Sequence, residues 1–195
     1  MRVRVAALCC LLVMTGSVTV CSQDTELRDR YLDRPRGPYR GQVIDAETRA
    51  PLANVVVVAL WRRNRVYPLH TVSERYAVRE TLTDAEGHFV LDGKDVEERA
   101  PSRTYHPEFL IFKPEYGAFP RNHVAPTGYV GGIFERPGAV VELPRLLDRE
   151  ARRKHLLSFG PHTYSDTPFR DLPELVRRFN LERMAVGFEP LLPPE

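Results

Sequence analysis

Cysteine is nearly absent from this sequence. The 195 residues include three cysteines, Cys9, Cys10 and Cys21, and none follows position 21. The rest of the chain therefore has no disulfide, no thiol nucleophile and no thiolate metal site. Because it has no thiols that could pair wrongly, this part of the sequence is compatible with an oxidising compartment.

An excess of either charge is also lacking. The chain has 28 Lys and Arg residues against 26 Asp and Glu residues. Arg2 and Arg4 are the only charged residues among the first 22, so removing that segment leaves 26 of each sign. A neutral domain with scattered charges has no electrostatic footprint for nucleic acid, and we expect no nucleic-acid partner.

The first segment has the order of a secretory signal. Arg2 and Arg4 precede an apolar run from Val5 to Met14, and small residues follow it. The run is too short to span a bilayer comfortably. We therefore predict that residues 1–22 are a signal peptide and that this is an exported bacterial protein of the periplasm or the periplasmic side of a membrane.

Cys21 decides how the mature chain would be held in the envelope. It stands where a bacterial lipoprotein carries its lipidated cysteine, which would make residues 1–20 the signal. Val20 fits that pattern poorly, because a small residue is expected before the cysteine. Cleavage after Ser22 is the alternative, and the sequence leaves both open. In either case residues 23–37 are charged and predict a tether, and a lipid on Cys21 is the only membrane contact we expect.

A dense β pattern occupies residues 38–146. Short strands are expected at 40–45, 55–60, 77–84, 88–91 and 109–113, with two more between 128 and 146. The run from Val55 to Leu60 is apolar throughout, which predicts a strand that is buried on both faces or central in a sheet. We interpret Trp61 to Tyr76 as a long polar link. Short strands separated by turn signals favour an antiparallel β-sandwich.

The stretch TDAEGHFVL, from Thr83 to Leu91, combines turn and strand signals. Asp84 can bond the backbone two residues on, and Gly87 supplies a positive φ without steric cost. Phe89 and Leu91 then share one face and are expected in the core. This local chemistry predicts a hairpin.

The final part, residues 147–195, is expected to be a helical extension and tail. Helices are predicted over Arg145 to Phe159 and over Arg170 to Gly187. In the second, Asp171 and Glu174 form the pattern of a capping box, Pro173 lies in the first turn and Gly187 can end the helix. An apolar stripe on this helix predicts packing against the sandwich rather than a docking face; it comprises Leu172, Leu175, Val176 and Phe179.

From about Pro38 to Leu146 the chain resembles the carboxypeptidase regulatory-like domain family. The residues that match are Gly41, Val43, Asp45, Thr48, Pro51, Leu52, Val55 and Val57, then Thr81, Thr83, Asp84, Gly87 and Phe89. The resemblance implies a small transthyretin-like, or prealbumin-like, β-sandwich. It also implies that the matching residues define the fold and are not catalytic. The two C-terminal helices are not part of the family pattern.

Sites for metals and catalysis fit the sequence poorly. Asp84 and Glu86 match a calcium loop only loosely, because strands flank them. No compact ligand pair joins any of the six histidines, which are His70, His88, His106, His123, His155 and His162. The Tyr-Arg-Gly-Ser motif of the hydroxyisourate hydrolases ends their chains, whereas Tyr39 and Arg40 begin the first strand here. No GxSxG element occurs. We expect no cofactor, no metal and no catalytic residue.

The sequence therefore predicts a non-catalytic envelope module with a binding or structural role. Its variable loops, Trp61 to Tyr76 and Lys94 to His106, would contact an envelope protein or a glycan. The candidate contact residues there are Trp61, Arg62, Arg63 and Tyr105, since aromatic and arginine side chains suit contact surfaces. The alternative is a hydrolase or a metal-dependent enzyme with its site in the region from His106 to Tyr129.

Overall fold

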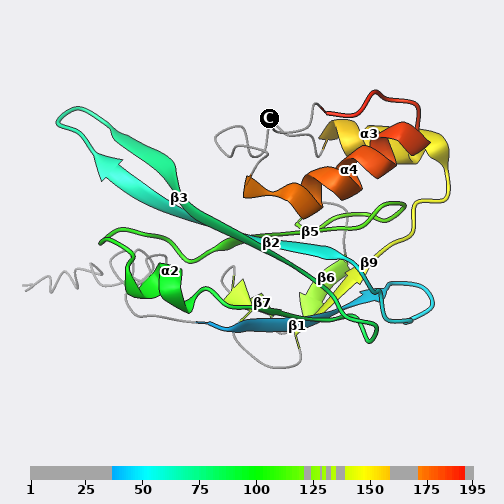
Figure 1. Ribbon diagram of the computed structural model, residues 1–195, viewed down its shortest axis with the longest axis horizontal. Helices are drawn as coiled ribbons and strands as arrows, with labels where there is room; N and C mark the ends of the chain where they lie inside the picture. Colours follow the sequence, from blue (N-terminus) through cyan, green and yellow to red (C-terminus); the bar gives the residue numbers. More distant parts are fainter. Residues whose placement is uncertain are drawn as a thin grey trace, which may run out of the picture.

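The computed structural model describes residues 37–120, 124–127, 129–130, 133–134, 139–158 and 171–191, with only the backbone described from 124 to 134. These residues form two β-sheets that pack face to face, with helices on the outer face of one sheet (Figure 1). The predicted signal, Cys21 and the predicted tether up to residue 36 lie outside the described residues, as do His123 and His162.

The first sheet has four strands in the order β4-β1-β9-β6. Their bounds are β1 Tyr39–Asp45, β4 His88–Leu91, β6 Val124–Thr127 and β9 Val140–Leu143. Strand β1 pairs antiparallel with β4 and parallel with β9, while β6 and β9 are antiparallel. The sheet is therefore mixed. Strand β1 is an inner strand, because β4 and β9 pair with its two sides.

The second sheet has the order β3-β2-β5, and both outer strands are antiparallel to β2. The bounds are β2 Val56–Val66, β3 Thr71–Leu82 and β5 Glu108–Phe112. A separate two-stranded ribbon pairs β7 Tyr129–Val130 with β8 Ile133–Phe134. The segment from Lys94 to His106, predicted as a loop, begins with a short helix, α2 Lys94–Glu98.

The predicted polar link from Trp61 to Tyr76 is wrong. Strands β2 and β3 run through this segment and stay paired up to Val66 and Thr71, with the turn at residues 67–70. One opposite-charge pair lies directly across the ladder of this segment, Arg63 and Glu74 at 2.6 Å. Cross-strand pairs of this kind stabilise a ribbon that buries little apolar surface, so the polar composition did not indicate a loop.

The apolar run from Val55 to Leu60 is buried on both faces, as predicted. Val57 and Ala59 point between the two sheets, where they meet core residues such as Phe89 and Val141. Val56 and Val58 point to the other side and meet the helices. Because successive side chains of a strand point to opposite faces, a strand covered on both sides requires apolar residues at every position.

Helices α3 Arg149–Ser158 and α4 Pro173–Ala185 lie over the outer face of the β3-β2-β5 sheet (Figure 1). The predicted stripe of α4 packs there: Leu172, Val176 and Phe179 are buried, and Leu175 is partly buried. The ring centroids of Phe112 and Phe179 are 5.6 Å apart. The helical layer therefore covers a face that would otherwise be apolar and exposed.

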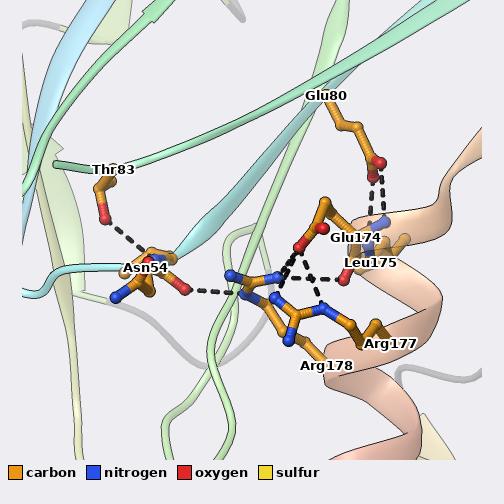
Figure 2. Close-up of polar contacts among 8 residues, drawn as sticks. Asn54, Glu80, Thr83, Glu174, Leu175, Arg177 and Arg178 are labelled. Atoms are coloured by element: carbon orange, nitrogen blue, oxygen red, sulfur yellow. Dashed lines mark hydrogen bonds and ion pairs between the residues drawn. The ribbon is translucent and has the colours of Figure 1, made fainter.

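The start of α4 differs from the predicted capping box. The helix begins at Pro173 and has no side-chain cap of its own, and Asp171 pairs instead with Arg75 of β3. The carboxylate of Glu80 in β3 accepts hydrogen bonds from the backbone N–H groups of Glu174 at 2.8 Å and Leu175 at 3.1 Å (Figure 2). The sheet thus supplies the cap that the helix lacks.

The end of α4 follows the prediction for Gly187. This residue has a φ of +85°, and its N–H donates to the carbonyl of Met184 at 3.1 Å. The N–H of Phe188 donates to the carbonyl of Arg183 at 2.8 Å. These two bonds make a Schellman motif, which ends a helix with glycine in the left-handed region.

The stretch from Thr83 to Leu91 is a corner between the two sheets and not a hairpin. Strand β3 belongs to one sheet, whereas β4 pairs with β1 in the other. The predicted turn chemistry is present: Asp84 Oδ1 accepts from the N–H groups of Glu86 and His88, and Gly87 has a φ of +76°. Phe89 and Leu91 are buried in the core, as predicted.

Candidate functional site

The part of β2 and β3 that projects from the sandwich is the best candidate for a contact surface. We define the arm as residues 62–75. It extends beyond the body of the molecule as a twisted two-stranded ribbon, seen at the upper left of Figure 1. Its strands remain in register to the turn, so the arm is a continuous hydrogen-bonded ladder.

The apex of the arm is apolar and exposed. The apex residues and their exposed fractions are Val66 54%, Tyr67 41%, Leu69 96% and Val72 41%. Tight turns are usually built from Gly, Asn, Asp, Ser and Pro, and here only Pro68 belongs to that set. Clustered exposed apolar side chains, rimmed by polar residues, mark contact surfaces more often than single ones do.

The apex has a defined conformation. The N–H of Tyr67 donates to the carbonyl of His70 at 2.8 Å, which closes the turn around Pro68 and Leu69. The rings of Tyr67 and His70 stack with centroids 4.9 Å apart and an interplanar angle of 17°. A hydrogen bond with Tyr67 raises the pKa of Arg65. These contacts leave Leu69 as the most exposed apolar residue of the arm.

The arm has more basic than acidic residues. It contains four arginines, Arg62, Arg63, Arg65 and Arg75, and one acid, Glu74. Arg63 and Arg65 lie 2.6 and 3.1 Å from the same Glu74 carboxylate oxygen. The single negative charge of Glu74 therefore faces the two positive charges of Arg63 and Arg65, and this end of the arm has a net positive charge.

The base of the arm is fixed to the body by the segment before β5. The N–H of Asn64 donates to the carbonyl of Arg103 at 3.0 Å, and the N–H of Tyr105 donates to the carbonyl of Arg62 at 2.7 Å. The side-chain amide of Asn64 also donates to the Tyr105 hydroxyl at 2.6 Å. The arm is therefore held at its base on the side that β3 does not cover.

Of the four predicted contact residues, Trp61 is not in a loop. It is fully buried between the sheets, where its indole N–H donates to Glu97 of α2 at 3.2 Å. Glu97 also accepts from the Tyr39 hydroxyl. Gly93 lies so close that an added Cβ would be 2.4 Å from the Trp61 ring. Trp61 therefore anchors the base of the arm in the core.

The other three predicted residues lie together at the base of the arm. Arg62 and Arg63 are partly exposed in β2, and Tyr105 bonds to Arg62 through the backbone. Arg62 lies 3.5 Å from Glu108, and the Arg63 guanidinium lies over the Tyr76 ring. Sequence reasoning missed the apex residues. The available signal was the group of apolar residues around Pro68 inside an otherwise polar segment.

A second polar cluster joins α4 to the sheet (Figure 2). Arg178 is buried, and its Nε donates to the carbonyl of Asn54 at 2.8 Å. Glu174 pairs with Arg177 at 2.9 Å and with Arg178, and the bond with Arg177 lowers the pKa of Glu174. Figure 2 shows these groups satisfying one another and the backbone, which is the geometry of a structural junction.

A third cluster joins α3, α4 and the turn after β5. The buried Glu182 accepts from Arg152 Nε at 2.7 Å and from the backbone N–H of Glu115 at 3.0 Å. The bond with Glu182 raises the pKa of Arg152. His155 is buried nearby, and that burial lowers its pKa while Glu182 opposes the shift. These groups tie the two helices to each other and to the sheet.

Residues of the family-like signature hold turns and sheet junctions. Asp45 Oδ1 accepts from the N–H groups of Glu47 and Thr48, both at 2.8 Å, and the bond with Thr48 is the main reason that its pKa is lowered. Thr83 Oγ1 accepts from the N–H of Val55 at 2.9 Å and donates to the carbonyl of Leu52 at 2.6 Å. Each of these side chains stabilises backbone geometry.

The region from His106 to Tyr129, the predicted alternative site, is only partly described. His106 is buried, His123 lies outside the described residues, and only the backbone is described at Tyr129. Within the described residues, no group of three or more His, Cys, Asp or Glu side chains is arranged to hold a metal ion.

In the same described ranges, no helix combines the length and apolar character needed to cross a membrane.

Comparison with known proteins gave no relative: no family model, no curated protein and no solved structure matches this chain.

Proposed function

We propose that this protein is a non-catalytic binding module of a bacterial cell envelope that contacts its partner through the β2–β3 arm. The observation that carries this proposal is the exposed apolar apex, with Leu69 at 96% exposure, at the end of a paired ribbon. The exposed apolar side chains of the apex do not stabilise the fold, because apolar surface stabilises a fold only when it is buried. Contact with a partner would bury them.

The proposal includes a family for residues 38–146, the carboxypeptidase regulatory-like domains, with a transthyretin-like topology and residues 147–195 as a helical extension. Three signature positions support it. An added Cβ at Gly41 would lie 2.7 Å from the Phe89 ring, so these two residues fit only as a pair. At Gly87, the positive φ and a backbone oxygen 2.5 Å from an added Cβ both require glycine.

Export through residues 1–22 is the second part of the proposal. The sequence order of charge, apolar run and small residues supports it. Intact mass and N-terminal sequencing of the mature protein test it. A lipid-modified Cys21 supports the anchored form, and a free Gln23 supports the released form. A mature chain that retains Met1 contradicts export.

An arm-shortened variant tests binding by the arm. Arg65 and Val72 are directly opposite in the ladder and have the same hydrogen-bonding phase as Tyr67 and His70, which close the native turn. Residues 66–71 can therefore be replaced by the two-residue turn Asn-Gly. The replacement is made in a Cys21→Ser chain, where a lipid cannot hold the protein in place. We expect the parent chain to sediment with the envelope fraction and the arm-shortened chain to be released, with the melting temperatures of the two chains nearly equal.

The arm is the wrong element if both chains sediment equally. A matched variant, Leu69→Asn, keeps the ladder and changes only the most exposed apolar residue. It should show intermediate release if the apex makes the contact.

A further inference from the structure

We infer that the arm binds the surface of a lipid bilayer that carries anionic headgroups, with its apex inserted among them. This inference rests on the proposed binding role of the arm and names the partner. It follows from which faces of the ribbon are apolar, from the placement of the arginines and from the distance between these two features.

The apex is apolar on both faces of the ribbon. Arg65 and Val72 are directly opposite in the ladder, and so are Val66 and Thr71. Because neighbouring residues of a strand point to opposite faces, Val66 and Val72 lie on opposite faces. Leu69 lies at the end, between the two strands. A flat protein surface would contact only one face, whereas a bilayer interface surrounds the apex on every side.

Arginines follow the apex on both faces. Arg63 and Arg65 share the face of Val72, while Arg62 lies on the face of Val66 and is directly opposite Arg75. The guanidinium group binds phosphate through two parallel hydrogen bonds and is less strongly hydrated than an ammonium group. Arg62 and Arg75, at the base, lie against Glu108 and Asp171 of the body, whereas Arg63 and Arg65 lie behind the apex and share one carboxylate. The two arginines behind the apolar tip match the chemistry of phosphate headgroups above acyl chains.

The spacing also fits a bilayer interface. Arg65 and Arg63 are one and three residues from Val66, which at about 3.3 Å per residue places them about 3 and about 10 Å behind it. Interfacial elements insert to a depth of about 5–10 Å into the headgroup and acyl boundary. Tyr67 suits the same boundary, because its ring is apolar and its hydroxyl is polar.

A fluorescent label at the apex tests the inference in the full chain. Cys9, Cys10 and Cys21 are changed to serine, and an environment-sensitive dye is attached to a Leu69→Cys chain. The control carries the dye at Glu47→Cys, an exposed position in the turn after β1. The two chains share the same N-terminal segment, so a difference between the labels reports on the arm alone. Vesicles of equimolar phosphatidylcholine and phosphatidylglycerol are the probe.

We expect the emission at residue 69 to shift to the blue and to be quenched by lipid-borne quenchers, and the emission at residue 47 to stay unchanged. Vesicles of phosphatidylcholine alone should give a weaker response. The double variant Arg63→Gln and Arg65→Gln should bind more weakly by about fivefold for each arginine.

The inference is wrong if residue 69 shows no shift, if both labels respond equally, or if neutral vesicles act as well as anionic ones. Failure here is separable from failure of the proposed function. An arm-dependent association with the envelope that persists without any vesicle response means a protein or glycan partner, whereas loss of that association as well removes the binding role of the arm.

Discussion

Two buried aromatic rings of this protein each pack directly against a glycine. Gly93 lies against the Trp61 ring and Gly41 against the Phe89 ring, and an added Cβ at either glycine would overlap the ring. Protein interiors are packed densely enough that one extra methyl group must displace a neighbour. Each ring therefore occupies space that a side chain at the neighbouring glycine would take.

Truncation of Phe89 should strongly destabilise the fold. Phe89 is buried between the sheets, so Phe89→Ala should cost about 3–5 kcal/mol of unfolding free energy. Val90, its neighbour in β4, points outward and is exposed, and Val90→Ala should cost less than about 0.5 kcal/mol. Urea unfolding of the two variants measures the difference, and equal costs would contradict the placement of Phe89 in the core.

His155 should make the stability depend on pH. Burial lowers its pKa in the folded state, whereas the unfolded chain takes up a proton near the ordinary value of about 6.5. Its stabilising contribution is therefore present above about pH 6.5 and is lost as the pH falls toward the folded pKa. Urea unfolding at about pH 7.5 and about pH 5.5 should show a smaller loss for His155→Gln than for the parent chain. Equal losses would show that His155 does not titrate differently on folding.

Single residues were predicted well where their role is local. Asp84 and Gly87 form their turn through bonds within a few residues, so the sequence contains all the information needed. The burial of Phe89 followed from its position in an alternating strand. The role of Glu80 could not be predicted, because its partners are backbone groups 94 and 95 residues away in sequence.

At the scale of elements, helix α4 is capped by Glu80 of strand β3 and not by a residue next to the helix. Glu80 is only partly buried, and burial raises its pKa although it accepts two backbone N–H groups. Arg75 of the same strand pairs with Asp171, just before the helix. Strand β3 therefore positions the first turn of α4 at two points.

Removal of the Glu80 carboxylate should loosen the start of α4. Glu80→Ala should cost about 1 kcal/mol, the usual loss for a helix cap, and Glu80→Gln should cost less because one acceptor oxygen remains. Glu86→Ala is the control, since this residue is exposed in the corner after β3. Urea unfolding provides the comparison, and a Glu80→Ala chain as stable as the control would refute the capping role.

The arm shows why element boundaries were hard to predict between Trp61 and Tyr76. A strand buried on one face alternates between apolar and polar residues, but the arm buries neither face, so this pattern is missing. Its two strands are joined by the ladder, in which Arg63 lies opposite Glu74, and the sequence does not reveal which residues are opposite until the turn is placed. The exposed apolar residues at the apex were not singled out from the sequence for the same reason.

At the scale of the molecule, the sandwich and the helices are one packing unit. The outer face of the β3-β2-β5 sheet carries apolar residues that α3 and α4 cover; the buried ones in the strands are Val56, Val58, Leu60, Val78, Leu110 and Phe112. The continuous apolar run of β2 predicted burial on both faces, and the stripe of α4 predicted packing on the sandwich. The sequence did not reveal that these two predictions describe the same interface.

A chain that ends at Leu146 should therefore not behave as a stable domain. Loss of α3 and α4 exposes the outer face of the sheet, and large apolar patches of this kind promote aggregation. We expect the truncated chain to elute as aggregates and to bind a hydrophobic dye, whereas the arm-shortened chain stays monomeric. A monomeric truncated chain with an intact β spectrum and no dye binding would show that the helices are dispensable.

Site-specific photo-crosslinking in living cells tests the central claim, contact through the arm, most directly. A photoreactive amino acid replaces Leu69 at the apex or Glu47 in the turn at the far end of β1. The proposed binding role predicts a discrete envelope adduct, with lipid or with protein, from position 69 and none from position 47. No adduct at position 69, or the same adducts from both positions, would contradict it.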